Sequence, residues 1–346
     1  MNGRERILNL IKGQPADCLA CMPITMMFAS DLYGAHYVEY ATDHRVQSAA
    51  QVKIAERFDL DHVSVISDPA IEASDCGAEV VFFEDAPAAF KEDASLLRDK
   101  SVLSGLSVPD PRRGPRMSNH VLAVRDLAQA VGHERLVEGW IEGPCAQAAD
   151  LRGINRLMLD FFDDPAFVRE LVNFVVELEI GFGLAQVAAG AELVGIGDAA
   201  SSLIGPGLYE AFIRAGQQRI VAALHAAGAI CRLHICGNNL PLLPSAAELG
   251  CEIIDVDGPT VPMSEARRAT GEEQVLCGNL DPVRSVRDGT PESIRGELVE
   301  CHVAAGPRYI VAAGCEIPRG TALENLEAMV SFAHETTADL AEGTPR

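Results

Sequence analysis

Short apolar runs alternate with longer segments of helical periodicity along most of this chain. Eight of these runs are bounded by turn or helix-start residues, which is the pattern of buried strands. They cover residues 20–27, 61–67, 135–142, 192–197, 229–235, 252–256, 274–279 and 308–313. Helical patterns separate most of them, so the order of elements predicts an α/β fold.

Two of the helical segments have clear boundaries. Residues 165–190 begin with a proline, repeat apolar side chains at a spacing near 3.6, and stop at Gly190. Residues 206–228 repeat the pattern. Eight strand–helix units favour a (β/α)8 TIM barrel over an open doubly wound sheet, and 346 residues with 48% hydrophobic content are enough to build one. We expect a single barrel domain over residues 1–346.

The main irregularity lies between the second and third predicted strands. Residues 76–134 contain a possible hairpin, in "GAEVVFFEDAPAAFKED", and a stretch rich in proline, glycine and arginine, in "SVPDPRRGPRMSN". A helix at 119–132 then returns the chain to the third strand. We interpret 76–134 as an excursion near the barrel mouth.

Charge and composition exclude several classes of partner. The chain carries 50 acidic and 28 basic residues, for a net charge of −22. Such a chain is a poor ligand for a phosphate backbone or an anionic membrane surface. The N-terminus "MNGRERILNLIKG" has no apolar signal region, and no later run approaches 18 uninterrupted apolar residues. We expect a cytoplasmic protein that binds neither nucleic acid nor membrane.

One pattern among the ten cysteines suggests a metal site. In "LHICG", His234 and Cys236 are two residues apart, so in an extended run their side chains share one face. Both lie at the C-terminal end of the fifth strand, where barrel enzymes place their chemistry, and Cys315 in "AAGCEIP" holds the equivalent position after the eighth. One histidine and two cysteines suit a tetrahedral Zn²⁺ with one open vertex. The alternative is a core histidine with two inert cysteines.

Several stretches, in order along nearly the whole chain, resemble the uroporphyrinogen decarboxylase superfamily. They are "NGRERILNLIKGQPAD", "IEGPCAQAADLRG", "GDAASSLIGPGLYEAF", "HICGNN", "GNLDP" and "AAGCEIPRGTALENLEAM". The last is similar to the zinc-dependent methyltransferases of that superfamily, in which H-x-C and a distant cysteine bind zinc. The resemblance implies that His234, Cys236 and Cys315 are the zinc ligands.

The decarboxylases of the superfamily differ in one respect. They have arginines after the first strand, which hold the carboxylates of the substrate by bidentate hydrogen bonds. Between Lys12 and Arg45 this chain has no arginine or lysine, and its "PITMMF" stretch offers an apolar lining instead. The sequence therefore favours the methyltransferase branch.

That branch implies methyl transfer between a corrinoid protein and either a thiol such as coenzyme M or a methoxylated small molecule. The chain has nothing like the D-x-H-x-x-G cobalamin-ligand motif, so methylcobalamin is expected on a separate partner protein. Two alternatives remain: a uroporphyrinogen decarboxylase, and a non-catalytic zinc-binding or corrinoid-docking subunit.

Further polar residues stand at the ends of predicted strands and could orient a substrate or complete the zinc site. Helix capping and loop solvation explain them equally well. Glu142 and Asp198 are favoured because they directly precede turns at the mouth, and Asn279 in "GNLDP" is a third candidate. The remaining candidates are Asp68, Asp255, Asp257 and, in "GPCAQ", Cys145, for which a packing role is the simpler interpretation.

Overall fold

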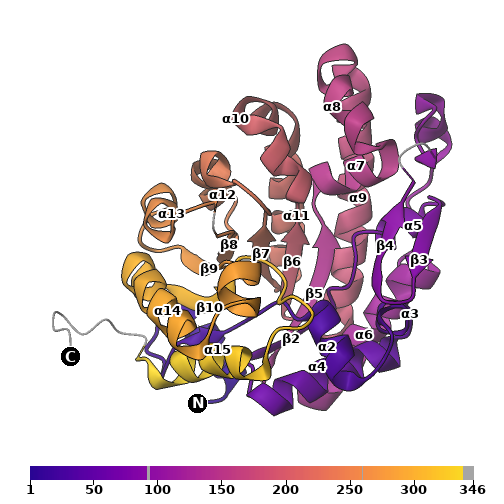
Figure 1. Ribbon diagram of the computed structural model, residues 1–346. Coiled ribbons are helices and arrows are strands. Elements are labelled where there is room, and N and C mark those ends of the chain that lie inside the picture. The colour runs from indigo at the N-terminus through magenta and orange to yellow at the C-terminus, as the bar shows by residue number, and fades with distance from the viewer. Residues whose placement is uncertain (92–93, 259, 338–346) are drawn as a thin grey trace.

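The computed structural model describes residues 1–91, 94–258 and 260–337 (Figure 1). Eight parallel strands form its central sheet, in the order β1-β10-β9-β8-β7-β6-β5-β2. They are β1 (Ala20–Cys21), β2 (His62–Ser64), β5 (Leu136–Glu142), β6 (Leu193–Gly197), β7 (Ile230–His234), β8 (Ile253–Val256), β9 (Val275–Leu280) and β10 (Tyr309–Ala313). Each lies within or overlaps one of the eight predicted runs.

The sheet curls into a nearly closed barrel, in which β1 pairs with the last strand, β10, and the strands from β2 to β10 follow their order along the chain. The first and last strands in the sheet order, β1 and β2, meet at a seam. There the Asp61 carboxylate accepts a hydrogen bond from the Cys21 backbone N–H at 2.6 Å and forms an ion pair with Arg6. The predicted (β/α)8 architecture is confirmed.

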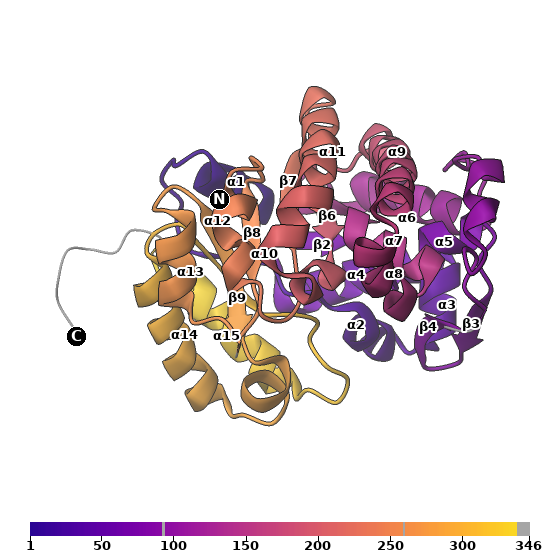
Figure 2. The same cartoon turned by 90° about the horizontal axis from the view of Figure 1, so that it is seen from above.

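Helices surround the strands on the outside (Figures 1 and 2). They are α1 (Gly3–Ile11), α2 (Met26–Tyr33), α3 (Tyr37–Thr42), α4 (His44–Phe58), α5 (Ile71–Asp75), α6 (Pro115–Val131), α7 (Pro144–Arg152), α8 (Ile154–Asp163), α9 (Pro165–Ala189), α10 (Gly205–Leu208), α11 (Arg214–Ala226), α12 (Leu243–Ala247), α13 (Met263–Thr270), α14 (Pro291–Ala305) and α15 (Leu323–Glu335).

Two hydrophobic cores result from this arrangement. The larger lies between the strands and the outer helices. The smaller includes Leu136, Leu193 and Ile253 at the starts of their strands, together with Ile7 and Leu10 of α1. Helix α1 thus covers the end of the barrel where the strands begin, which leaves the opposite end for a site.

Helix α9 begins and ends as its sequence predicts. The Asp164 side chain accepts a hydrogen bond from the Phe167 N–H at 3.2 Å, Pro165 is the first helical residue, and Gly190 ends the helix with φ +119°. By length and composition α9 could cross a membrane, but 56% of its apolar window is buried. It packs against α6, α11 and β5, as a core helix of a barrel does.

The excursion between β2 and β5 contains the predicted hairpin, with strands β3 (Val80–Phe83) and β4 (Ala86–Phe90) antiparallel. A 3-10 helix at Lys100–Gly105 follows. The return helix α6 starts at Pro115 instead of residue 119, because proline is well suited to the first turn and adds a turn to the expected helix.

Two predictions about element length were wrong. The expected strand 20–27 keeps only Ala20–Cys21, because Pro23 has no N–H to continue the ladder and α2 begins at Met26. The expected helix 206–228 is divided by a π-helical turn at Tyr209–Ile213. Apolar periodicity alone predicts neither the early end of the strand nor the π-helical turn.

Candidate metal centre

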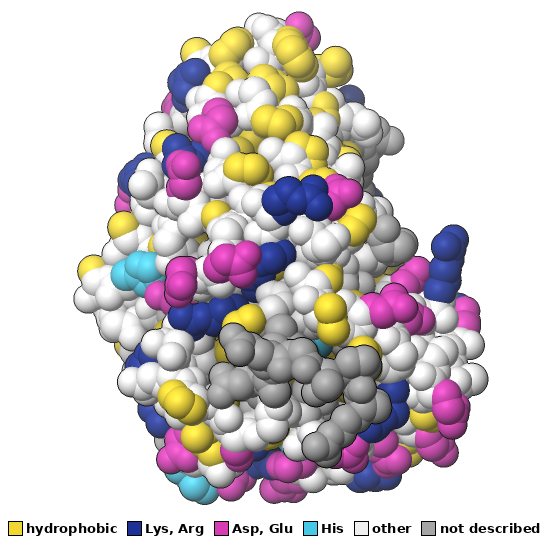
Figure 3. All heavy atoms as spheres, turned by 90° about the vertical axis from the view of Figure 1, so that its left-hand side faces the viewer, with side chains coloured by type: hydrophobic (Ala, Val, Ile, Leu, Met, Phe, Trp, Pro, Cys, Tyr) yellow, Lys and Arg dark blue, Asp and Glu magenta, His cyan; other side chains and the backbone are white. Residues whose placement is uncertain are grey.

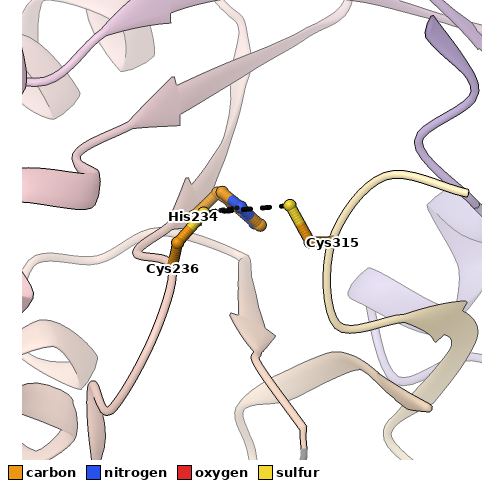
Figure 4. A group of neighbouring side chains, drawn as sticks. All are labelled: His234, Cys236 and Cys315. Carbon is orange, nitrogen blue, oxygen red and sulfur yellow. Dashed lines mark hydrogen bonds between the residues drawn. The ribbon is translucent and has the colours of Figure 1, made fainter. Parts of the chain in front are cut away.

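The metal-ligand candidates meet where the strands end. His234 is the last residue of β7, Cys236 follows two residues later, and Cys315 comes two residues after β10. His234 Nε2 lies 2.9 Å from Cys236 Sγ, and the two sulfur atoms are 3.9 Å apart. In Figure 4 the His234 ring and the Cys315 side chain point toward each other from opposite sides of the opening. All three ligand atoms lie within 4.8 Å of one another.

These separations can be compared with those in a tetrahedral zinc site. Zinc–sulfur bonds of about 2.3 Å place two sulfur ligands about 3.8 Å apart, which matches the distance between Cys236 and Cys315. Zinc–nitrogen bonds of about 2.0–2.1 Å place nitrogen and sulfur about 3.6 Å apart. The distance from His234 to Cys236 is shorter than this, so a small rotation of either side chain is required. The three residues fit zinc in type and number, and the spacing of Cys236 and Cys315 fits without movement.

A carboxylate fixes the orientation of the His234 ring. Asp255 Oδ2 lies 2.7 Å from His234 Nδ1 and accepts a hydrogen bond from it, so Nε2 faces the two sulfurs. Burial disfavours the charged ring, but Cys236 and Asp255 outweigh it and raise the pKa of His234, so the ring is protonated in the metal-free protein and a metal would replace the proton on Nε2. Metal-binding histidines typically have such a carboxylate behind them. Asp255 was a candidate for substrate or zinc contact, and the structure places it behind the histidine.

Asp255 is held in turn by the buried side chain of Arg232, at 2.8 Å from Nε to Oδ1, and Arg232 Nη1 also contacts Glu138 at 3.1 Å. Burial disfavours the ionised form of Asp255, but Arg232 and the bond with His234 outweigh it, so the pKa of the carboxyl lies below its ordinary value. Asp255 is therefore ionised at neutral pH.

The two thiols titrate as a pair. The hydrogen bond from Cys236 opposes the effect of burial and, with the positive His234 ring, lowers the pKa of Cys315 to about 4. The remaining proton stays on Cys236, whose pKa is raised by the bond to Cys315 and by burial. One thiolate is thus available at neutral pH even in the metal-free protein, and thiolate is the form that binds metal.

A second group of possible ligands lies at the start of β7 and near β8: His225, Cys231 and Glu252. Glu252 already accepts a hydrogen bond from the Cys231 backbone N–H at 2.9 Å and contacts the partly exposed His225 at 3.2 Å. This group is at the opposite end of the strands from Cys236, away from the cavities described next.

Two cavities meet at the group formed by His234, Cys236 and Cys315. The smaller, about 180 Å³, is lined by His234, Cys236 and Cys315 themselves, together with residues of the ends of β2, β5 and β6. The larger, about 640 Å³, is mostly apolar and is lined by the hairpin strand β4, by α7 and by Cys236. They share Pro69, Glu142, Ala199 and Cys236, so the excursion helps to enclose the space beside the metal group.

Of the three residues proposed as catalytic, only Glu142 lines this space. It ends β5, is 9% exposed and borders both cavities, and its pKa is raised well above the ordinary value by burial and by the carboxylates of Glu72 and Asp150. Asp198 instead lies behind the wall, fully buried, where it accepts hydrogen bonds from the Ala146 N–H at 2.8 Å and from Gln217 Nε2 at 2.7 Å.

Asn279 lies apart from the metal group. Its Nδ2 donates to the Val261 carbonyl at 2.7 Å, and it lines a separate cavity of about 430 Å³. Cys145 is completely buried in α7, where burial raises its pKa well above the ordinary value, in keeping with a packing role.

The last two candidates, Asp68 and Asp257, form hydrogen bonds that order segments at the barrel mouth. Asp68 lines the smaller cavity and accepts a hydrogen bond from Arg116 Nη2 at 2.7 Å. Asp257 accepts from the Gly237 N–H at 2.5 Å, which orders the turn directly after Cys236. Neither is among the residues grouped as metal ligands.

Sequence reasoning missed Trp140 and Glu316. Trp140 lines the cavity and packs against the His234 ring, with centroids 6.0 Å apart. Gly195 on the neighbouring strand makes room for it, since a Cβ there would be 2.2 Å from the indole. The sequence contained a signal for each residue. Trp140 is two residues before Glu142 and so shares its strand face, and Glu316 directly follows Cys315.

Comparison with known proteins gives relatives of two kinds. The chain is 28% identical over 343 residues to a methylcobamide:CoM methyltransferase MtbA of Methanosarcina mazei, covering 95% of this chain and 97% of the relative. It is 24% identical to a methylcobamide:CoM methyltransferase MtaA of Methanosarcina barkeri, covering 96% and 97%. It is also 28% identical over 299 residues to a uroporphyrinogen decarboxylase of Thioalkalivibrio sulfidiphilus, covering 81% of each.

Among solved structures, a methyltransferase from Methanosarcina mazei has the same fold, with a TM-score of 0.88 at 22% identity over 97% of this chain and 99% of the other. The family model described as "Uroporphyrinogen decarboxylase (URO-D)" matches residues 2–336. The chain therefore belongs to the uroporphyrinogen decarboxylase family.

Proposed function

We propose that this protein is a zinc-dependent methyltransferase that moves a methyl group from a corrinoid, carried by a partner protein, to a thiol. One observation carries the proposal: His234, Cys236 and Cys315, from strands distant in sequence, converge on one point that lines a cavity. The relatives named methylcobamide:CoM methyltransferases support it, because they match nearly the whole chain.

In this proposal His234 Nε2 and the sulfurs of Cys236 and Cys315 hold the zinc ion, and Asp255 fixes the ring of His234. A zinc ion in that position supplies Lewis acidity that keeps a bound thiol ionised at neutral pH. The apolar cavity beside Cys236 receives the rest of the acceptor and limits the access of water.

The overall reaction balances without any further reactant. The carbon–cobalt bond of methylcobalamin breaks and leaves its electron pair on cobalt, a carbon–sulfur bond forms, and the thiol proton is released to solvent. The cavity walls hold the thiol sulfur where the methyl group arrives, so positioning is the main task of the chain's own residues.

The corrinoid partner must approach the end of the barrel where Cys236 and Cys315 lie. The net charge of −22 does not by itself mark a docking face. On the face seen in Figure 3, Asp and Glu side chains stand beside Lys and Arg. We therefore place the docking surface at the barrel mouth, because the corrinoid must come within reach of Cys236 and Cys315 there.

Decarboxylation of uroporphyrinogen is a weaker candidate, although relatives with that name match the chain. Its substrate carries eight carboxylates, and the described residues that line the smaller cavity include no lysine or arginine. We expect no formation of coproporphyrinogen from uroporphyrinogen III at an enzymatic rate.

Turnover of free methylcobalamin tests the proposal. Zinc-loaded protein should demethylate it in the presence of a thiol and form the matching methyl thioether, and zinc-free protein should not. Bound zinc without transfer to any thiol would instead indicate a docking subunit. Activity that appears only with a methoxylated donor and the cognate corrinoid protein would indicate the O-demethylase direction.

A further inference from the structure

The cavity beside the metal group has an unusual charge pattern for a site that would accept an anionic thiol. Its lining includes three carboxyl groups, those of Asp68, Glu142 and Glu316, and none of its described lining residues is a lysine or an arginine. An anionic group on a small metal-bound thiol would meet no lysine or arginine among the described residues that line this space of about 180 Å³.

Two arginines act on these carboxyls, and each has a carboxylate partner. Arg116 contacts Asp68, at 2.7 Å between Nη2 and Oδ2. Arg319 binds Asp31 through both Nε, at 2.8 Å, and Nη2. Neither arginine is among the lining residues of the two cavities described above.

The larger cavity has one basic residue in its described lining, Lys91. Its side chain is 56% exposed on the hairpin side of the cavity and forms an ion pair with Glu79. Lys91 is therefore a solvated group at the rim, and its attraction for an anion is screened by water and by its partner.

Glu142 is the group in this space that lacks a protein partner. Its carboxyl is 9% exposed, and within the described part of the chain no hydrogen bond or ion pair reaches it. Its backbone N–H donates to Glu72 Oε1 at 3.1 Å. A buried carboxyl without partners is unfavourable, so a ligand that donates hydrogen bonds to it would be stabilised there.

An aromatic surface stands on the same side of the strand. Trp140 precedes Glu142 by two residues on β5, so both side chains face the barrel interior, and both line the smaller cavity. Burial and the Glu72 and Asp150 carboxyls raise the pKa of Glu142, and an ammonium ion held against it would favour its ionised form. An indole next to that carboxylate attracts cations, through the ring face and through charge-assisted hydrogen bonds.

We propose that the thiol methylated at this site carries an ammonium group that binds Glu142 beside Trp140. This inference rests on the proposed function. Uncharged thiols of the same length should follow in preference, and thiols with a sulfonate or a carboxylate should bind worst. Coenzyme M, a sulfonate that appears in the names of the relatives, is therefore a poor acceptor for this chain.

Three thiols of matched length separate charge from size. They are cysteamine, 2-mercaptoethanol and coenzyme M, which carry +1, 0 and −1 on a two-carbon chain. Zinc-loaded protein is titrated with each by calorimetry, and the kcat/KM for methylation by free methylcobalamin is measured in parallel. We expect cysteamine to lead coenzyme M by at least about tenfold in both measurements, the factor of one hydrogen bond to a charged group.

The variant Glu142→Gln removes the pocket carboxylate and should reduce the ratio of cysteamine to 2-mercaptoethanol by about tenfold. Thiol acidity is the same for both proteins, so this change in ratio reports the pocket alone. Glu170→Gln is the control, because Glu170 is an exposed residue of the outer helix α9 and the substitution makes the same change in net charge. It should keep the wild-type ratio.

The outcomes distinguish the two proposals. Coenzyme M as the tightest ligand and best acceptor, or an unchanged ratio in Glu142→Gln, would overturn the inference and leave methyl transfer to thiols intact. Methylation of none of the three thiols would overturn the proposed function, and the binding order would still decide the question of charge.

Discussion

The substitution Asp255→Asn tests how the metal group is held. An asparagine amide can accept the Arg232 hydrogen bond with its oxygen, but it then turns its NH2 toward His234 Nδ1. That nitrogen must become an acceptor, and the ring proton moves to Nε2, the atom that faces the two sulfurs. The change leaves all three ligands in place and disables one of them.

The expected cost can be estimated from the contacts that change. Loss of the carboxylate behind a metal-bound histidine typically weakens metal binding about 10–100-fold. This corresponds to about 1.4–2.7 kcal/mol. Arg232 keeps Glu138 but loses a charged acceptor, which should lower the free energy of unfolding by about 1.5–3 kcal/mol.

The assay is competition for zinc against a chromophoric chelator, with chemical unfolding measured on the same samples. His225→Ala serves as control, since it removes a histidine from the second group of possible ligands and should leave zinc affinity unchanged. Wild-type zinc affinity in Asp255→Asn would refute the assigned role of Asp255, and a loss in His225→Ala would move the metal to the other group.

Three further predictions concern other parts of the molecule. Cys315→Ala should lose zinc and methyl transfer but melt within a few degrees of the wild type, because the barrel is held by its cores; full zinc occupancy by elemental analysis would contradict this. Burial raises the pKa of Asp198 to about 6, so the folded state binds the extra proton and stability falls as pH rises from 3.8 through 6. Asp198→Asn should therefore gain up to about 3 kcal/mol relative to wild type between pH 4 and pH 7 in urea unfolding, and an equal difference at both pH values would exclude this. Gly195→Ala would press into Trp140 and should cost about 1–3 kcal/mol, whereas Gly207→Ala, which meets nothing within 4 Å, should cost far less; equal unfolding midpoints would show that the indole moves freely.

The barrel could be predicted from the sequence because its strands are buried on both faces and appear as separate apolar runs between capped helices. The same rule failed at residues 20–27, where the run continues into α2 and only Pro23 indicates the change. Apolar content does not report backbone hydrogen bonding, so strand ends and the π-helical turn at Tyr209–Ile213 could not be predicted.

The convergence of His234, Cys236 and Cys315 could be predicted because two of these residues share a strand face and the third follows the equivalent strand. The roles of the carboxylates could not, since Asp198 and Asp255 both stand at strand ends in the sequence. In the structure Asp198 accepts a hydrogen bond from the Ala146 N–H outside the cavity, and Asp255 lies behind His234. Whether a carboxylate at a strand end faces the cavity depends on packing between neighbouring strands. Trp140, for example, takes its position only because Gly195 on the next strand has no side chain.

X-ray absorption of the bound zinc, with and without a saturating thiol, tests the central claim most directly. Zinc-loaded protein should show two sulfur ligands and one imidazole, from Cys236, Cys315 and His234, and should gain a third sulfur at about 2.3 Å when 2-mercaptoethanol is added. A ligand set with fewer than two sulfurs, or a spectrum that the thiol does not change, would contradict the account.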